Sequence, residues 1–136
     1  SYGPGYGDWI VTNPGHWIYE GTGLKKGDAV RGVIGWEYHG PPLAQIAGLE
    51  VLAASSLTPR DARGGPAKEH AAVVYRCPKG NWVFNAGTIW WPEHLSSPPG
   101  HIPGRTFSGP FGVNPLIQRI TTNLLDRMLR DAPRRG

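Results

Sequence analysis

The sequence predicts an α+β or α/β fold in which a β-rich mixed sheet is closed by one C-terminal amphipathic helix. Three observations support this: short β-rich runs are separated by Gly and Pro, two of them have hairpin spacing, and a helical pattern appears near the end. The 136 residues fit a single domain, 1–136, or the C-terminal part of a larger one. Gly and Pro make up a quarter of the chain, yet six Trp and five Tyr favour a folded, loop-rich domain over disorder.

The first half of the chain is predicted to alternate short strands with turns. Residues 1–7, rich in Gly, Pro and Tyr, are expected to form an irregular arm. The β-rich runs predict strands at Asp8–Thr12, His16–Glu20, Val33–His39 and Leu49–Leu57. For the last of these a strand is favoured over a helix, because the run is short and is bracketed by Gly48 and Pro59. Loops are expected at Gly21–Asp28 and Thr58–Ala67.

A β-hairpin is the best-defined unit of the sequence. Two β-rich runs, Ala71–Arg76 and Trp82–Ile89, flank the five residues Cys77–Asn81, which include Pro and Gly. This spacing predicts two antiparallel strands with a short connection. The following segment, Ser96–Gly112, is too rich in Pro and Gly for regular structure, and ordered loops of this length usually serve a function.

One closing helix is predicted within residues 113–132, with Pro115–Arg130 as its regular part. Asn114 suits the N-cap and Pro115 the first helical position. Apolar side chains recur at steps of three and four and form one wide stripe: Leu116, Ile117, Ile120, Leu124, Leu125 and Met128. Pro133 is expected to end the helix, which must pack its stripe against the sheet.

Charge and cysteine content narrow the classes of partner. The net charge is +4, and the basic tail 133–136 carries part of the excess. That tail could touch nucleic acid or an anionic surface, but a solvated, fraying terminus is the favoured explanation. Without a basic stripe we expect no nucleic-acid partner. No apolar run reaches membrane-spanning length, so no membrane partner is expected. The single Cys77 excludes an internal disulfide and fits a reducing, cytoplasmic location.

The stretch Lys79–Leu95, KGNWVFNAGTIWWPEHL, is the strongest candidate for a site. The predicted strand Trp82–Ile89, expected to be buried, ends there in bulky aromatic and charged residues instead of small turn residues. Ligands of open α/β sheets lie beyond the carboxyl ends of strands. We therefore expect a pocket at this rim.

The rim supplies an acid, an imidazole and two indoles. Glu93 and His94 are the catalytic candidates, because a carboxylate beside a histidine can position or protonate a small polar substrate. Trp90 and Trp91 are expected to bind the substrate, with packing in the core as the alternative. His101, on the following loop, could line the same pocket or anchor the loop backbone.

Glu37 and His39 form a second candidate pair. On a strand they would share a face, so they could contact substrate or, with a third ligand such as His16 or Glu20, bind iron or zinc. The alternative is a polar strand face, which we favour because no metal-site spacing is present. If the chain lines a pocket, Glu37 and His39 are expected to contact the substrate from a neighbouring strand, and no metal or cofactor is expected to be held by this chain. Trp36, next to Glu37 in sequence, could form an aromatic wall with Trp90 and Trp91, with core packing as the alternative.

Three segments resemble a known family. They are GTGLKKGDAVRGVIGWEYHG (21–40), VFNAGTIWWPEHLSSPPG (83–100) and VNPLIQRITTNLLDRM (113–128), and their order and spacing also fit. They look like the C-terminal end of the large (beta) subunit of N,N-dimethylformamidase and its relatives, from about His16 onward. The absence of an initial Met favours a piece of a longer or processed polypeptide.

The resemblance implies a fold and an activity. The chain would be the last part of a glutamine-amidotransferase-like three-layer domain. The family enzyme is a cytoplasmic, oligomeric amidohydrolase that cleaves a small tertiary amide to an amine and formate. Its iron is held by tyrosine, histidine and glutamate, the latter two from a His-x-Glu motif upstream of this region. This chain has only Glu37-x-His39, the reverse order, so no metal ligand is carried over.

The chain is therefore expected to contribute scaffold and pocket rim, with the rest of the parent polypeptide or another subunit as partner and a small amide as substrate. The isolated chain would be inactive. The alternative is a non-catalytic domain that binds a ligand or a protein partner.

Overall fold

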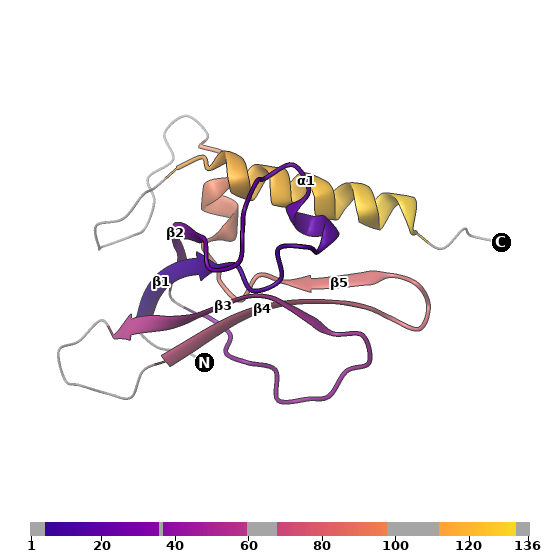
Figure 1. Cartoon of the computed structure of the whole chain (residues 1–136), viewed down its shortest axis with the longest axis horizontal. Coiled ribbons are helices and arrows are strands. Elements are labelled where there is room, and N and C mark those ends of the chain that lie inside the picture. The colour runs from indigo at the N-terminus through magenta and orange to yellow at the C-terminus, as the bar shows by residue number, and fades with distance from the viewer. Residues whose placement is uncertain (1–4, 36, 60–67, 98–111, 133–136) are drawn as a thin grey trace.

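A curled antiparallel sheet of five strands, covered on one face by a single helix, forms the domain (Figure 1). The computed structural model describes residues 5–35, 37–59, 68–97 and 112–132. The strands are β1 (Gly5–Ile10), β2 (Ala29–Gly35), β3 (Glu50–Pro59), β4 (Lys68–Arg76) and β5 (Trp82–Asn85). The helical elements are the 3₁₀ turns η1 (Trp17–Tyr19) and η2 (Trp91–His94) and the helix α1 (Pro115–Arg130).

The sheet has the strand order β2-β1-β3-β4-β5, and every pairing among the described residues is antiparallel. The α+β expectation is confirmed. The hairpin is confirmed as well: β4 pairs with β5, from Val73 opposite Asn85 to Arg76 opposite Trp82. The strand predicted at Leu49–Leu57 is β3, and the loop predicted at Gly21–Asp28 contains no helix or strand.

The helix begins and ends as predicted. The Asn114 side chain accepts hydrogen bonds from the backbone N–H of Leu116 at 2.9 Å and of Ile117 at 3.4 Å, which satisfies two donors of the first turn. The apolar stripe packs on the sheet core through Ile117, Ile120 and Leu124. Leu125, predicted beside the stripe, is instead 52% exposed.

The predicted strand at His16–Glu20 is wrong, and a side-chain hydrogen bond explains why. His16 accepts a hydrogen bond from the backbone N–H of Ile18 through its Nδ1 at 3.2 Å, and this N-cap starts the 3₁₀ turn η1. Asn123 on α1 then donates to the carbonyls of Ile18, at 3.0 Å, and Glu20, at 2.8 Å. The turn is thereby attached to the helix.

Two strand boundaries also differ from the prediction. The strand expected at Val33–His39 is Ala29–Gly35, and at Glu37 the backbone has φ 51°, which an extended strand does not allow. Trp36 lies outside the described residues. The strand expected at Trp82–Ile89 ends at Asn85 and is half-buried, not buried, because β5 is an edge strand.

The predicted arm and one predicted loop are partly strand. Gly5–Gly7 belongs to β1, where a side chain at Gly7 would place its Cβ 2.7 Å from Cδ2 of Leu57. The strand β3 continues through Thr58 to Pro59. Residues 1–4, 60–67, 98–111 and 133–136, and with them most of the loop predicted at Ser96–Gly112 and the basic tail, lie outside the described residues.

Alternate residues of β4 and β5 face opposite sides of the sheet. We call the side that packs against α1, η1 and η2 the closed face; it carries His70, Ala72, Val74, Trp82 and Phe84. We call the other side the groove face; it carries Ala71, Val73, Tyr75, Val83 and Asn85. The core of the domain lies between the closed face and the helix.

Candidate functional site

The segment Asn85–Thr88, which starts at the last residue of β5, connects the two edges of the curled sheet. The Thr88 hydroxyl lies 3.0 Å from the carbonyl of Val33 on β2 and accepts from the backbone N–H of Gly35 at 3.3 Å. The Asn85 side chain accepts from the backbone N–H of Gly87 at 2.8 Å. The residues at this junction are therefore held from both edge strands, which gives a site built on it a fixed frame.

Both rim tryptophans are buried. Trp90 is 8% exposed, and its ring covers Gly35 so closely that a Cβ there would lie 1.8 Å from Trp90 Cζ3. Trp91 is 7% exposed, stacks in the core with its ring centroid 4.8 Å from that of Trp9, and donates through Nε1 to the Thr121 hydroxyl at 3.0 Å. In this chain the two indoles join β2, the core and α1, as the packing alternative expected.

Glu93 and His94 lie on η2, where the chain turns toward the start of α1. His94 is 1% exposed, and its Nδ1 lies 3.2 Å from the carbonyl of Gly112, to which it donates. Its own carbonyl accepts from the backbone N–H of Asn114 at 2.9 Å. Glu93 is half-buried beside it. His94 therefore anchors the residues that precede the helix, and His101 lies outside the described residues.

Glu37 and His39 do not lie on a strand. Glu37 is exposed, while His39 joins two segments through its backbone: its N–H donates to Gly87 at 3.0 Å and its carbonyl accepts from Ala71 at 2.9 Å. The predicted shared strand face is therefore wrong. Of the six predicted site residues, one, His39, lines the groove described below.

The His39 ring is paired with Asn85, a residue that the sequence did not indicate. Asn85 Nδ2 lies 2.8 Å from His39 Nδ1. Because Asn85 Oδ1 accepts from Gly87, its Nδ2 is the donor, so His39 Nδ1 is the acceptor. The neutral ring then carries its proton on Nε2. The hydrogen-bond network thus assigns one tautomer to His39.

A groove of about 700 Å³ runs along the groove face, between the sheet and the loop 40–49. One wall comes from the hairpin strands and the other from the apolar loop: His39, Gly40, Pro41, Pro42, Leu43, Ala44, Ile46, Leu49, Ala71, Val73, Tyr75, Val83 and Asn85. Its volume lies in the range of small-molecule sites. The alternation of side chains along the predicted hairpin could have indicated which residues share this face. It could not have indicated that the loop 40–49 covers them.

His70 is a buried histidine on the closed face. Its Nε2 donates to the carbonyl of Ala86 at 2.9 Å, so Nδ1 carries the lone pair, and that buried Nδ1 has no hydrogen-bond partner. Burial, opposed by the hydrogen bond to Ala86, lowers the pKa of His70 to about 4. Gly87, with φ 67°, lets the chain run close to the His70 ring, because a Cβ at this position would lie 2.7 Å from His70 Nε2. His70 is therefore neutral at pH 7.

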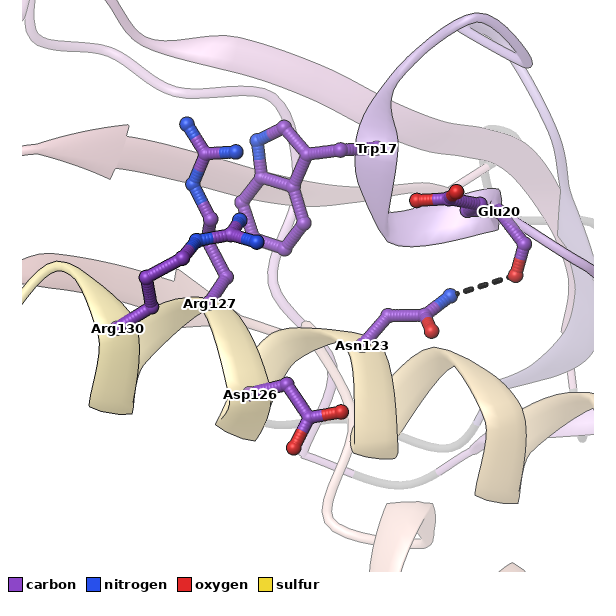
Figure 2. A pocket seen from close by; sticks show the side chains of 6 residues that line it. All are labelled: Trp17, Glu20, Asn123, Asp126, Arg127 and Arg130. Atoms are coloured by element: carbon purple, nitrogen blue, oxygen red, sulfur yellow. Dashed lines mark hydrogen bonds between the residues drawn. The ribbon is translucent and has the colours of Figure 1, made fainter.

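A smaller, polar pocket of about 290 Å³ lies between η1 and α1 (Figure 2). Its wall includes Arg127, whose guanidinium carbon lies 5.3 Å from the ring centroid of Trp17 and 5.6 Å from that of Trp82. Arg127 Nε also donates to Asp131 at 2.8 Å. Glu20 and Asp126 share the pocket with Arg127 and Arg130, so opposite charges offset each other there.

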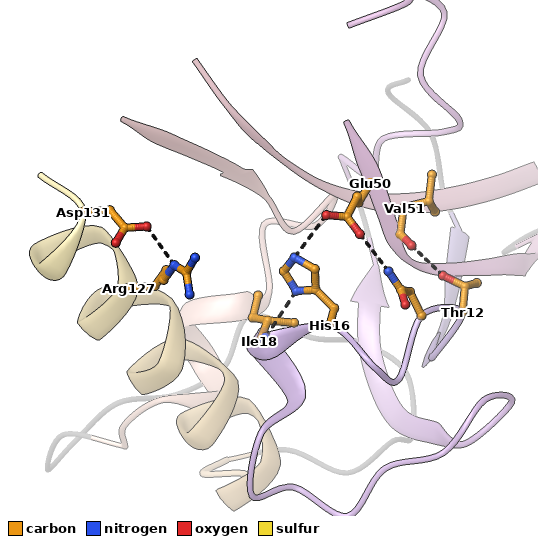
Figure 3. A network of polar contacts seen from close by, with 8 residues as sticks. Thr12, His16, Ile18, Glu50, Val51, Arg127 and Asp131 are labelled. Carbon is orange, nitrogen blue, oxygen red and sulfur yellow. Dashed lines mark hydrogen bonds and ion pairs between the residues drawn. The ribbon is translucent and has the colours of Figure 1, made fainter. Parts of the chain in front are cut away.

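Figure 3 shows the polar network next to this pocket. His16 Nε2 lies 3.6 Å from Glu50 Oε1, and the other oxygen of Glu50 accepts from Asn13 at 3.0 Å. Burial lowers the pKa of His16, against the opposing effect of the Glu50 carboxylate. A neutral His16 keeps Nδ1 free to accept from Ile18, so the network stabilises the start of η1.

No group of three or more His, Cys, Asp or Glu side chains within the described residues is placed to hold a metal ion. In the same part of the chain, no helix combines the length and the apolar character that crossing a bilayer requires.

Comparison with known proteins identifies a family. The family described as "N,N-dimethylformamidase beta subunit-like, C-terminal" matches residues 1–104. This range contains the junction, the groove and the rim, and it ends before α1. No significant match was found among curated proteins or among solved structures.

Proposed function

The chain belongs to the N,N-dimethylformamidase beta subunit-like, C-terminal family, and from this membership we propose that it is the C-terminal portion of an amidohydrolase. The substrate class is small N-substituted amides, which the parent protein would hydrolyse to an amine and a carboxylic acid. The family match across most of the chain carries this proposal. A C-terminal domain of a subunit implies a further part of the polypeptide or a partner subunit.

The proposed role of this chain is to supply scaffold and pocket rim. Iron, which the family resemblance implies, does not fit the described residues, because no three of their His, Cys, Asp or Glu side chains are placed to hold a metal ion. We therefore place the iron ligands elsewhere in the parent protein, an oligomeric cytoplasmic enzyme in this proposal. The antiparallel sheet and α1 would form the last part of its glutamine-amidotransferase-like domain.

Glu93 and His94 have different proposed parts in this function. Glu93 is half-buried, so its carboxylate can contact a substrate bound at the rim. His94 is 1% exposed and donates to the Gly112 carbonyl, which favours a positioning role for its ring over proton transfer. Trp90 and Trp91 would hold η2 in place beneath the substrate. Such fixed placement of reacting groups accounts for much of the rate gain in enzymes.

The test is substitution in the complete parent protein, with amine and formate release from N,N-dimethylformamide as the assay. Glu93→Gln should lower kcat at least about tenfold, since a positioned acid or base contributes about 10²–10⁴-fold. Glu20→Gln is the matched control, because this exposed carboxylate directly follows η1, away from the rim, and it should leave kcat unchanged.

His94→Asn keeps a donor for the Gly112 carbonyl and should retain more activity than His94→Ala. Folded variants of Glu93 and His94 with full activity would show that the rim is only structural. If the wild-type parent protein hydrolysed no amide, the amidohydrolase proposal itself would be contradicted.

A second candidate function is ligand binding without catalysis by this chain. The apolar groove on the groove face favours it, because its volume and its few polar groups are typical of binding sites. Iron in the purified parent protein would favour the amidohydrolase.

A further inference from the structure

The groove combines a polar end with apolar walls. His39 and Asn85 lie at one end, beside Ala71, and Tyr75 lies toward the other, opposite Val83 on β5. From Ala71 to Tyr75 the strand covers about 13 Å, at about 3.3 Å per residue. A ligand can therefore extend along the strands with one end at His39.

The loop that covers the groove is unusually apolar and exposed. Leu43 is 103% exposed and Ile46 is 40% exposed, although both are large aliphatic residues at the groove. Leu49 completes this wall from the other end of the loop. Exposed aliphatic side chains gathered around a concave surface are typical of binding sites. The loop thus offers contacts that nothing in the described part of the chain uses.

The groove contains no charged side chain. None of the residues that line it is Asp, Glu, Lys or Arg. A carboxylate or ammonium bound there would lose its hydration without gaining a partner of opposite charge, and this is costly. The lining therefore favours a neutral ligand.

The polar end selects a hydrogen-bond acceptor. Asn85 Oδ1 accepts from the backbone N–H of Gly87, and one N–H of Asn85 Nδ2 donates to His39 Nδ1, at 2.8 Å each. The donors that remain on this pair are His39 Nε2–H and the second N–H of Asn85 Nδ2. A carbonyl oxygen is the ligand atom that suits them, and the assigned tautomer presents His39 Nε2–H without a change of the network.

We propose that the groove binds a neutral, elongated molecule whose carbonyl oxygen accepts from His39 Nε2 and whose apolar body lies along Val73 and Val83 under Leu43 and Ile46. His39 and Asn85 then form a donor pair for the carbonyl. This site lies on the groove face, away from η2, and it does not depend on the amidohydrolase proposal.

The experiment uses the full isotope-labelled chain and three probes of one chain length: N-methyloctanamide, octanoate and octylammonium. The amide should shift the backbone NMR signals of Val73 and Val83 and the His39 Nε2 signal. Octanoate and octylammonium should bind at least about tenfold more weakly, because the groove offers no counter-charge.

Substitution of His39 separates recognition of the carbonyl oxygen from nonspecific hydrophobic binding. His39→Ala should weaken amide binding about three- to tenfold, the effect expected for the loss of one hydrogen bond. His39→Gln, which keeps an N–H donor, should restore part of it. His16→Gln, a histidine on the other side of the sheet, is the control and should bind the amide like the original chain.

Three results would overturn the proposal. These are equal binding of all three probes, amide binding that His39→Ala leaves unchanged, and no shift at Val73 or Val83 up to the solubility limit in a chain whose spectrum shows that it is folded. None of these results bears on amide hydrolysis by the parent protein, which is measured separately.

Discussion

Neighbouring residues of β4 face two different environments. His70, Ala72 and Val74 lie on the closed face and are fully buried against the aromatic core under α1. Val73 and Tyr75 alternate with these residues along the strand. They lie on the groove face and are half-buried. One backbone thus carries a packed layer on one side and an unfilled groove on the other. The difference indicates that the closed face determines stability and that the groove face is free to bind.

The aromatic cluster makes the closed face the more sensitive side, and Trp91→Ala should show the largest effect. Trp91 contacts the rings of Trp9 and Phe84 and donates to the Thr121 hydroxyl, so its removal leaves a cavity and takes away one hydrogen bond. We expect a loss of about 3–5 kcal/mol in the free energy of unfolding. Urea denaturation followed by circular dichroism measures it. A loss below about 1 kcal/mol would mean that the closed face is not the stabilising layer.

The helix offers a pair of leucines with the same chemistry and different burial. Leu124 is 6% exposed on the apolar stripe, whereas Leu129 is 77% exposed. Leu124→Ala should cost about 2–5 kcal/mol of unfolding free energy, and Leu129→Ala less than about 0.5 kcal/mol. Both are measured by urea denaturation. Equal effects would contradict the placement of α1 on the closed face.

His70 gives the closed face a pH dependence. Burial lowers its pKa from 6.5 to about 4 in the folded chain, so folding favours the neutral ring. Its contribution to stability is complete above pH 6.5, because both states are then neutral, and it is lost as the pH falls toward 4, because the unfolded state gains the proton first. The loss should reach about 3 kcal/mol, from about 1.4 kcal/mol per pKa unit.

The measurement is urea denaturation between pH 7 and pH 4, compared with His70→Leu, which lacks the titrating ring. Subtracting the two curves removes the carboxylates that also titrate in this range. If the unfolding free energies of the two proteins changed with pH in parallel, His70 would be accessible to protons in the folded chain. The closed face would then be less dry than its packing indicates.

Local signals were sufficient for some of this architecture. The Asn114-Pro115 start of α1 and the Cys77–Asn81 hairpin connection depend on residues next to each other in sequence, and both were predicted correctly. The errors arose where a side chain bonds the backbone. His16 capping Ile18 turns a predicted strand into η1, and Asn85 bonding Gly87 ends β5 early. Such bonds compete with strand pairing, and composition alone does not reveal which wins.

The candidate site was harder to predict because it depends on long-range pairing. His39 and Asn85 are 46 positions apart and meet only through the backbone bonds of His39 to Gly87 and Ala71. The sequence singled out His39 for its imidazole but placed it on a strand. It gave no indication of Asn85, since an Asn marks a turn more often than a site. The roles of Glu93 and His94 stay predictions.

Val73 and Val74 provide the smallest and most direct comparison, because the two residues are identical and adjacent. Val74 is 0% exposed on the closed face, and Val73 is half-buried at the groove. Val74→Ala removes two methyl groups from a filled layer and should cost about 2 kcal/mol of unfolding free energy, while Val73→Ala widens an existing groove and should cost about 0.5–1 kcal/mol.

The order should reverse for ligand binding. Val73→Ala removes part of the apolar wall and should weaken N-methyloctanamide binding by a few-fold, since each buried methylene contributes about 0.8 kcal/mol. Val74→Ala, once shown to be folded, should leave that binding unchanged because its side chain points to the other face. Denaturation and NMR titration of the same two variants measure both quantities. Equal stability losses with equal binding losses would mean that the two faces are not separate, and that the groove is part of the packed core.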